Sequence, residues 1–188
     1  WPANGVPRKK IIMHEFIEGL KNAKGVKSLR FDVPWAEIST LGIGSFVEIL
    51  AEPSDDIELR GILSFCKQQK IKPFIIGAGS NIAGCDEPYK GLVIRLSNKI
   101  FHEISFGRAH ATVGAGVRLK GLAEKAAEKG FGGLSPLAAI PGTIGGAVKM
   151  NAGADGVSIS DFIEEICGID FDLRIWRASK NEINSSQL

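Results

Sequence analysis

The sequence predicts an α+β protein with mixed strand directions. Three segments of the 188 residues have apolar side chains at helical spacing, and they lie among short apolar runs that are typical of strands. Two of these runs, 92–96 and 109–113, are separated by polar turns and not by a helix. A strictly alternating parallel fold is therefore not expected.

The bulk composition is that of a folded globular protein. Hydrophobic residues make up 44% and charged residues 23%, and the length fits one domain or two small subdomains. The net charge of +2, with acids and bases interspersed, gives no indication of nucleic acid or a membrane surface as a partner. No apolar run approaches the roughly 18 residues of a membrane span, so we expect a cytoplasmic protein.

The first helix is expected over 12–24, where Phe16, Ile17 and Leu20 share one face and Gly25 is a plausible end. Residues 46–50 are expected to form a strand, and a helix follows Pro53.

The helix after Pro53 begins with Asp55 and Glu58, a D-x-x-E variant of the capping box. Residues 74–76 form the next short strand. Strand, helix and strand together give a βαβ-like unit.

The second half of the chain continues with strands at 92–96 and 109–113 and a helix over 119–127 that stops at Gly130. A long strand is expected over 162–171. Residues 173–176 begin its hairpin partner.

The most unusual composition is found in residues 140–156, which contain five glycines and almost no charge. Glycine costs more conformational entropy than any other residue, so such a loop indicates main chain in close approach to a ligand or at positive φ. The alternative is a tight structural connection between packed elements.

Residues 77–81, Gly-Ala-Gly-Ser-Asn, directly follow a predicted strand. Successive backbone N–H groups in such a turn form an anion nest, which Ser80 and Asn81 would extend. The loop is not a Rossmann fingerprint, because Ile82 replaces the third glycine, and no Gly-Lys-Ser/Thr of a P-loop follows. A plain turn explains it equally well.

Two other glycine pairs carry weaker signals. Residues 114–116, Gly-Ala-Gly, lie between a strand and a helix, but Leu119 occupies the third glycine position, which favours a packing device over a cofactor contact. Residues 42–45 either line the same ligand-binding cleft as these glycine-rich loops or form a turn.

No metal or proton-transfer site is predicted. Cys66, Cys85 and Cys167 are too widely spaced for a zinc site or a disulfide framework, and they fit a reducing compartment. The three histidines show no metal-ligand spacing and are expected to be structural or surface residues. No Ser/His/Asp or Cys/His arrangement is supported by position.

Five motifs, in this order and spacing, resemble the UDP-N-acetylenolpyruvoylglucosamine reductases, also called UDP-N-acetylmuramate dehydrogenases. The resemblance covers roughly residues 30 to 175, and its last motif is the most specific. The motifs are Thr40-x-x-Ile43-Gly44, Gly77-Ala78-Gly79-Ser80-Asn81, Asp86-x-x-Tyr89-x-Gly91, Gly114-Ala115-Gly116, and residues 140–147 with Asn151-Ala152-Gly153-Ala154.

The resemblance implies an FAD-binding domain of the vanillyl-alcohol oxidase type, in which two α+β subdomains with mixed sheets hold an extended FAD. Residues 1–30 would be an N-terminal helical segment, 31–98 and 99–175 the two subdomains, and 176–188 the start of a hairpin or linker toward a substrate domain. Residues 77–81 and 140–147 would cradle the pyrophosphate, with 151–154 beside the ribityl chain and isoalloxazine. The implied cofactor-binding residues are Ile43, Gly77, Ala78, Gly79, Ser80, Asn81, Ile82, Ile140, Pro141, Gly142, Thr143, Gly145, Gly146, Ala147, Asn151, Gly153 and Ala154.

The implied activity is that of an FAD-dependent oxidoreductase of peptidoglycan synthesis. In the family, NADPH is the hydride donor and UDP-N-acetylglucosamine enolpyruvate is reduced to UDP-N-acetylmuramate. The family's catalytic residues, a Tyr-Arg-x-Ser motif with a later Ser and Glu, belong to a substrate domain that this chain does not contain. Residues 176–179, Trp-Arg-Ala-Ser, echo the motif but come too soon after Gly156.

The chain is therefore expected to be the FAD-binding part of such a reductase and inactive alone. Its start at Trp1 and its polar end over 184–188 also indicate a partial chain. The alternatives are the FAD-binding domain of another oxidase or dehydrogenase of the same fold, and a non-catalytic FAD-binding protein. The sequence does not indicate an oligomeric state.

Overall fold

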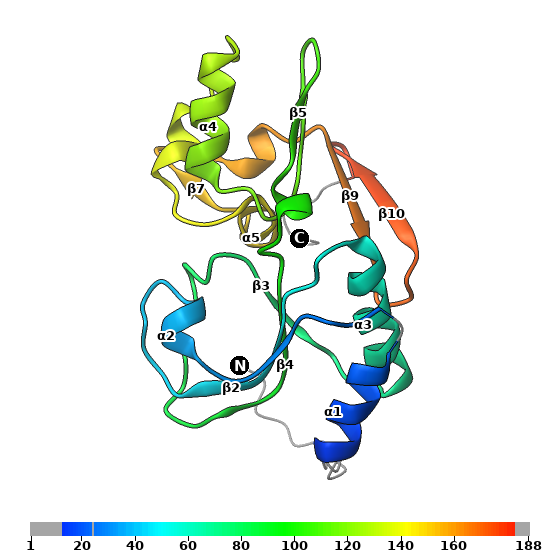
Figure 1. The fold of residues 1–188 in the computed structure, drawn as a ribbon. Coiled ribbons are helices and arrows are strands. Elements are labelled where there is room, and N and C mark those ends of the chain that lie inside the picture. Colours follow the sequence, from blue (N-terminus) through cyan, green and yellow to red (C-terminus); the bar gives the residue numbers. More distant parts are fainter. Residues whose placement is uncertain (1–12, 24, 183–188) are drawn as a thin grey trace.

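The computed structural model describes residues 13–23 and 25–182. The first twelve residues of the predicted segment 1–30, and the predicted polar end 184–188, lie outside the described residues. Figure 1 shows a lower part built around a sheet and an upper part that carries a helix and a projecting hairpin, with a second hairpin along one side.

The lower part is built on a four-stranded mixed sheet in the order β1-β2-β4-β3. Strand β1 (Leu29–Pro34) is antiparallel to β2 (Phe46–Ala51), whereas β2 and β3 (Phe74–Ile76) are both parallel to β4 (Tyr89–Arg95). The predicted strands at 46–50 and 74–76 and the helix between them are confirmed. Strand β4 lies between the two strands of the βαβ-like unit, which a local pattern does not reveal.

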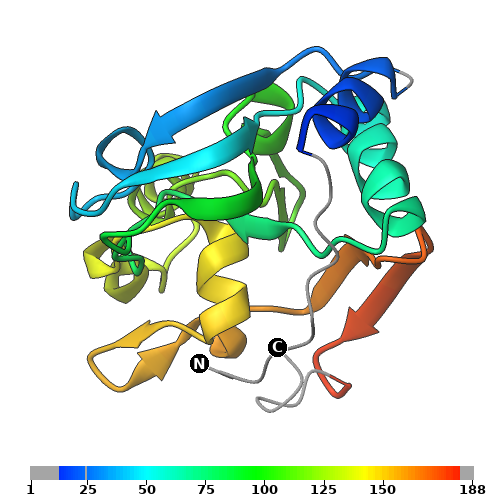
Figure 2. The same ribbon diagram turned by 90° about the horizontal axis from the view of Figure 1, so that it is seen from below.

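Helices α1 (Met13–Asn22) and α3 (Asp56–Gln68) pack together beside the sheet, as Figure 2 shows. Their apolar faces form one core with the sheet, which confirms the two predicted helices. The buried side chains of this core include Phe16, Leu20, Ile49, Ile62, Leu63, Cys66, Leu92 and Ile94. A second cluster holds the short helix α2 (Trp35–Ile38) through Trp35, Ile38, Val47, Leu50 and Val93.

Helix α3 begins at its predicted cap, but Glu58 does not complete a capping box. The Asp55 side chain accepts a hydrogen bond from the Glu58 N–H at 2.8 Å. The Glu58 carboxylate turns away and accepts bonds from Ser28 and Ser54. The capping-box prediction is therefore wrong for its second half, because a tertiary contact takes the carboxylate.

The upper part begins with the 3₁₀ turn η1 (Lys99–His102) and a hairpin of β5 (Ile104–Phe106) and β6 (Ala111–Val113). Helix α4 (Leu119–Glu128) confirms the predicted helix. After it come the 3₁₀ turn η2 (Ser135–Ala139), helix α5 (Ile144–Met150), a hairpin of β7 (Gly153–Ala154) and β8 (Val157–Ser158), and the 3₁₀ turn η3 (Ile159–Asp161). The core of the upper part is formed by Leu119, Leu137, Ala147 and Ile159.

Two sequence predictions in the upper part are wrong in extent. The glycine-rich run is a helix over Ile144–Met150 and not a continuous loop. The long strand over 162–171 is reduced to β9 (Glu165–Ile169), because a capping box between Ser158 and Asp161 holds the preceding residues in η3. Strand β9 pairs with β10 (Ile175–Ser179), the predicted hairpin partner displaced by two residues.

None of the helices in the described part of the chain is long and apolar enough to cross a membrane.

Candidate functional site

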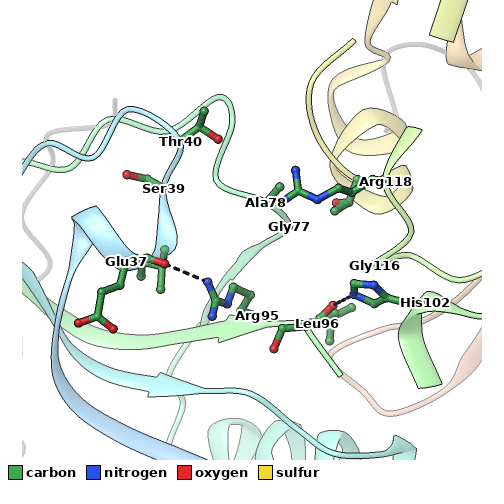
Figure 3. Close-up of a pocket in the computed structure, with 13 residues that line it drawn as sticks. Glu37, Ser39, Thr40, Gly77, Ala78, Arg95, Leu96, His102, Gly116 and Arg118 are labelled. Carbon is green, nitrogen blue, oxygen red and sulfur yellow. Dashed lines mark hydrogen bonds between the residues drawn. The ribbon is translucent and has the colours of Figure 1, made fainter. Parts of the chain in front are cut away.

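A pocket of about 390 Å³ lies between the lower and the upper part of the molecule. Three segments from the lower part and three from the upper part contribute to its wall (Figure 3). The lining residues are Glu37, Ile38, Ser39, Thr40, Gly77, Ala78, Arg95, Leu96, Ser97, His102, Gly116, Arg118 and Thr143.

Thr143 presents a buried hydroxyl group to this pocket. Thr143 is only 6% exposed, yet its Oγ1 atom has no hydrogen-bond partner among the described residues. A buried polar atom without a partner costs roughly 1–3 kcal/mol, so native proteins seldom retain one without a reason. Among the possible reasons, a ligand in the pocket would supply the missing acceptor.

Gly77 lies directly opposite this hydroxyl group. A Cβ atom on residue 77 would come within 2.1 Å of Thr143 Oγ1. Glycine is required here because the turn after β3 and the N-cap of α5 approach each other too closely for any side chain. The approach brings residues 77–78 and 143, which are far apart in the sequence, into one wall of the pocket.

The loop 77–81 has the free backbone donors that an anion requires. Gly79 has φ +68, and a Cβ there would meet the Ile38 carbonyl at 2.2 Å. Among the described residues, no hydrogen bond uses the N–H of Ala78, Gly79, Ser80 or Asn81 as its donor. The Thr40 hydroxyl donates to Ser80 Oγ at 3.2 Å and joins this loop to the end of α2.

The segment 140–147 offers fewer donors than its glycine content indicates. The Ile144 N–H donates to the Val117 carbonyl and the Gly145 N–H donates to the Ala115 carbonyl, both at 2.8 Å. These bonds pair the start of α5 with the chain that enters α4. The N–H groups of residues 144 and 145 are therefore unavailable to a ligand, whereas the buried Thr143 hydroxyl has no partner among the described residues.

The other predicted site residues lie outside the pocket lining. Ile43 is 54% exposed on the loop before β2, and Ile82, Ile140 and Ala147 pack into the two neighbouring cores. Asn151 ends α5 in the left-handed region, and its Oδ1 accepts from the Ser160 N–H at 3.3 Å. Gly142 lies near Ser80, Pro141 precedes α5, Gly146 lies within α5, and Gly153 and Ala154 form β7.

Four charged or titratable residues that line the pocket were not among the predicted site residues: Glu37, Arg95, His102 and Arg118. Arg118 is the N-cap of α4, at the position where a helix that follows a glycine turn meets a phosphate. That position was the one available signal. Arg95 and His102 come to the pocket through the ends of β4 and η1, which no local pattern indicates.

The pocket has the composition of a site for a polar, extended, anionic molecule. It combines free N–H groups, a buried hydroxyl and two guanidinium groups, and no carboxylate is directed into it in Figure 3. Among the described residues there is no group of three or more His, Cys, Asp or Glu that would hold a metal ion. These donors fit a diphosphate.

The comparison with protein families agrees with this chemistry. Residues 47–171 match the family described as "FAD binding domain". That range includes most of the pocket lining, from residue 77 to Thr143.

Two similar curated proteins carry the same name. The UDP-N-acetylenolpyruvoylglucosamine reductase of Aquifex aeolicus is 34% identical over 157 residues, which are 82% of this chain and 52% of that protein. The protein of the same name from Bacillus subtilis is 36% identical over 151 residues, 80% of this chain and 49% of the relative. The chain thus spans about half the length of the curated relatives that it matches.

Solved structures extend the likeness to the fold. The UDP-N-acetylenolpyruvylglucosamine reductase from Thermus caldophilus superposes with a TM-score of 0.64 at 28% identity, over 84% of this chain and 53% of that one. An alkyldihydroxyacetonephosphate synthase superposes with a TM-score of 0.66 at 15% identity, over 93% and 36% of the two chains. The second likeness concerns the fold alone, which is the α+β fold predicted from the sequence.

Proposed function

This chain belongs to the FAD-binding domain family, and we propose that it is the FAD-holding part of a UDP-N-acetylenolpyruvoylglucosamine reductase. The complete protein would reduce UDP-N-acetylglucosamine enolpyruvate to UDP-N-acetylmuramate in the cytoplasm, for peptidoglycan synthesis, with NADPH as the hydride donor. Bound FAD supplies reversible hydride transfer between two substrates. This chain contributes the cofactor site and no catalytic residue.

The division of the chain follows from the same proposal. Residues 31–98 and 99–175 form the two halves of the cofactor cleft, 1–30 are an N-terminal helical segment, and 176–188 lead toward a substrate domain. The separate cores around β2 and around Leu119 support the two halves.

The observation that carries the cofactor assignment is the unpartnered Thr143 hydroxyl opposite residues 77–81. In the proposal, the N–H groups of residues 78–81 and the Thr143 hydroxyl donate to the pyrophosphate oxygens of FAD. Residues 140–142, 146 and 151–154 border the remainder of the cofactor. The close packing of the Gly77 turn on Thr143 holds these donors in place without a ligand, which is the preorganisation that tight binding requires.

The alternatives remain another FAD-dependent oxidase or dehydrogenase and a non-catalytic FAD-binding protein. The sequence identities favour the reductase, since the relatives of that name from Aquifex aeolicus and Bacillus subtilis are 34% and 36% identical, whereas the alkyldihydroxyacetonephosphate synthase is 15% identical.

The test is FAD uptake by the purified chain, followed by visible absorbance and by quenching of flavin fluorescence. The variant Thr143→Val removes the hydroxyl and retains the shape. We expect it to weaken FAD binding about tenfold and to leave thermal stability unchanged or higher, because an unpaired buried group is removed. Thr112→Val, at an exposed position of β6, is the control and should leave both properties unchanged.

A wild-type chain that takes up no FAD would contradict the proposed cofactor. If the wild type and Thr143→Val bind FAD equally well, the hydroxyl group is not a cofactor ligand.

A further inference from the structure

Two arginines reach the pocket from different parts of the molecule. Arg95 ends strand β4 of the lower part, and Arg118 is the N-cap of helix α4 in the upper part. Figure 3 shows the Arg95 side chain at the base of the pocket and the Arg118 side chain extending toward Ala78. Their surroundings give them different roles.

The charge of Arg95 is already neutralised within the protein. Its Nη2 and Nε atoms donate to Glu52 Oε1 at 2.6 and 2.9 Å, and Nη1 donates to the Glu37 carbonyl at 3.3 Å. Burial alone would raise the pKa of Glu52, but the hydrogen bonds from Ser97 and Arg95 outweigh it and lower that pKa. Glu52 is therefore ionised near neutral pH, and Arg95 is one half of an ion pair that shapes the pocket wall.

The charge of Arg118 has no such partner. Its guanidinium group makes no ion pair and no hydrogen bond with any described residue, and the side chain is exposed. Glu37 does not neutralise it, because the Glu37 carboxylate binds Arg30 and is directed away from the pocket in Figure 3. His102 Nε2 lies 3.2 Å from the Leu96 carbonyl and is not directed at Arg118.

The backbone of Arg118 is nevertheless held firmly. Arg118 forms an isolated antiparallel bridge with Thr143, and the N–H of the next residue, Leu119, donates to the Gly142 carbonyl at 3.2 Å. This bridge places Arg118 next to Thr143, so the unpaired guanidinium and the unpartnered Thr143 hydroxyl belong to the same pocket. An anion between them and the loop 77–81 would satisfy both.

We propose that Arg118 recognises the diphosphate of the cofactor and that Arg95 is a structural residue of the same pocket. The inference rests on the proposed function, because the diphosphate belongs to FAD. A guanidinium group forms charge-assisted hydrogen bonds with phosphate oxygens, and its fixed fork favours two oxygens at once. Arg118 thus supplies the positive charge that neutral N–H groups and a hydroxyl lack.

The experiment is a titration of the purified chain with FAD at low and moderate ionic strength, for the wild type, Arg118→Gln, Arg118→Lys and Lys120→Gln. We expect Arg118→Gln to weaken FAD binding at least tenfold and to reduce its dependence on salt, and Arg118→Lys to recover part of the affinity. Lys120→Gln removes the same charge two residues away, outside the pocket, and should bind like the wild type.

Competition by ADP and by adenosine distinguishes recognition of the phosphate charge from recognition of the nucleoside. ADP should compete with FAD for the wild type and compete at least tenfold less well for Arg118→Gln, whereas competition by adenosine should not depend on residue 118. Circular dichroism should show an unchanged fold, because the Arg118 side chain holds nothing in place.

Equal FAD affinity of the wild type and Arg118→Gln would overturn the inference and leave the proposed function intact. A wild type that binds neither FAD nor ADP would overturn both.

Discussion

The side chain of Thr143 lies against the backbone of Gly77, so closely that a Cβ on residue 77 would come within 2.1 Å of Thr143 Oγ1. This contact joins the turn after β3 to the start of α5, and both residues line the pocket. It also leaves the hydroxyl buried without a partner. The same two residues therefore determine both the packing of the two halves and the donor that the pocket offers.

Gly77→Ala is expected to lower both stability and FAD affinity. The added methyl group forces the Thr143 side chain away, and the rotation of a β-branched residue next to a helix start is costly, about 1–3 kcal/mol for overpacking. The double variant Gly77→Ala/Thr143→Ala should recover stability but not FAD binding, as measured by thermal unfolding and flavin fluorescence.

The control for this prediction is Gly132→Ala, where a new Cβ meets no atom within 4 Å. It should unfold like the wild type. If the double variant is no more stable than Gly77→Ala alone, the strain does not come from Thr143.

Gly145 and Gly146 are expected to respond to alanine in opposite ways. A Cβ on residue 145 would meet Ala115 Cβ at 3.0 Å, whereas a Cβ on residue 146 would meet only Thr143 Oγ1 at 3.6 Å. Gly146→Ala should stabilise the folded chain by about 0.5–1 kcal/mol through its helix propensity, and Gly145→Ala should destabilise it.

For the cofactor, Gly146→Ala is expected to weaken FAD binding despite the higher stability, because the methyl group projects beside the Thr143 hydroxyl. Thermal unfolding and FAD titration of the two variants test this. If Gly146→Ala is less stable than the wild type, or if it binds FAD as tightly as the wild type, the proposal that the cofactor occupies the space next to residue 146 is contradicted.

Glu58 should make the folded chain sensitive to acid. Glu58 is 1% exposed, and burial alone would raise the pKa of its carboxyl group. Hydrogen bonds outweigh this effect and lower the pKa to about 2. Their donors are the N–H groups of Lys27 and Ser54 and the hydroxyl groups of Ser54 and Ser28. A folded-state pKa below the unfolded value of 4.5 contributes stability above pH 4.5, and this stability is lost as the pH falls toward 2. The shift corresponds to about 3 kcal/mol at neutral pH.

Glu58→Gln is therefore expected to destabilise the chain by about 3 kcal/mol at pH 7 and to flatten the pH dependence of stability between pH 5 and pH 2, roughly the window in which the carboxylate titrates. Urea unfolding at several pH values measures both effects. Asp56→Asn on the same helix, which removes only an exposed pair with Arg60, should cost less than about 1 kcal/mol. Equal effects of the two variants would show that the buried network is not a major source of stability.

Cys66 should resist thiol reagents that modify Cys85 and Cys167. Cys66 is buried in the core between α3 and the sheet, and burial raises the pKa of its thiol to about 11, whereas the other two cysteines are exposed. Labelling with a coloured disulfide reagent at pH 8 should show two fast thiols, and a third only after denaturation. Rapid modification of all three in the native state is the contradicting result.

The periodic segments were predictable because their patterns are local. Helices α3 and α4 and strand β2 each present a regular apolar face to one core, so their type and most of their bounds follow from spacing. The turn 77–81 could be proposed as an anion site for a similar reason, since a glycine-rich turn directly after a strand is itself the chemical signal.

Helix α5 was not predictable, because its stability comes from a partner. Gly145 and Gly146 disfavour a helix, yet Ile144 and Gly145 donate to the backbone of residues 117 and 115, which holds the first turn in place. The Glu58 carboxylate was misassigned for a similar reason, since its Oε1 atom accepts hydrogen bonds from Lys27 and Ser28, about thirty positions earlier in the chain, in addition to the local bonds from Ser54 to Oε2.

The sequence by itself determined the fold class, most of the helices, the family resemblance and the two glycine segments at which the cofactor site is proposed. These features depend on residue types within one segment. Only the tertiary structure decided which groups in those segments are free to bind: the Ile144 and Gly145 N–H groups are used within the protein, whereas the Thr143 hydroxyl and the Arg118 guanidinium are not. The physical reason is that a donor is available only if no distant part of the folded chain already occupies it.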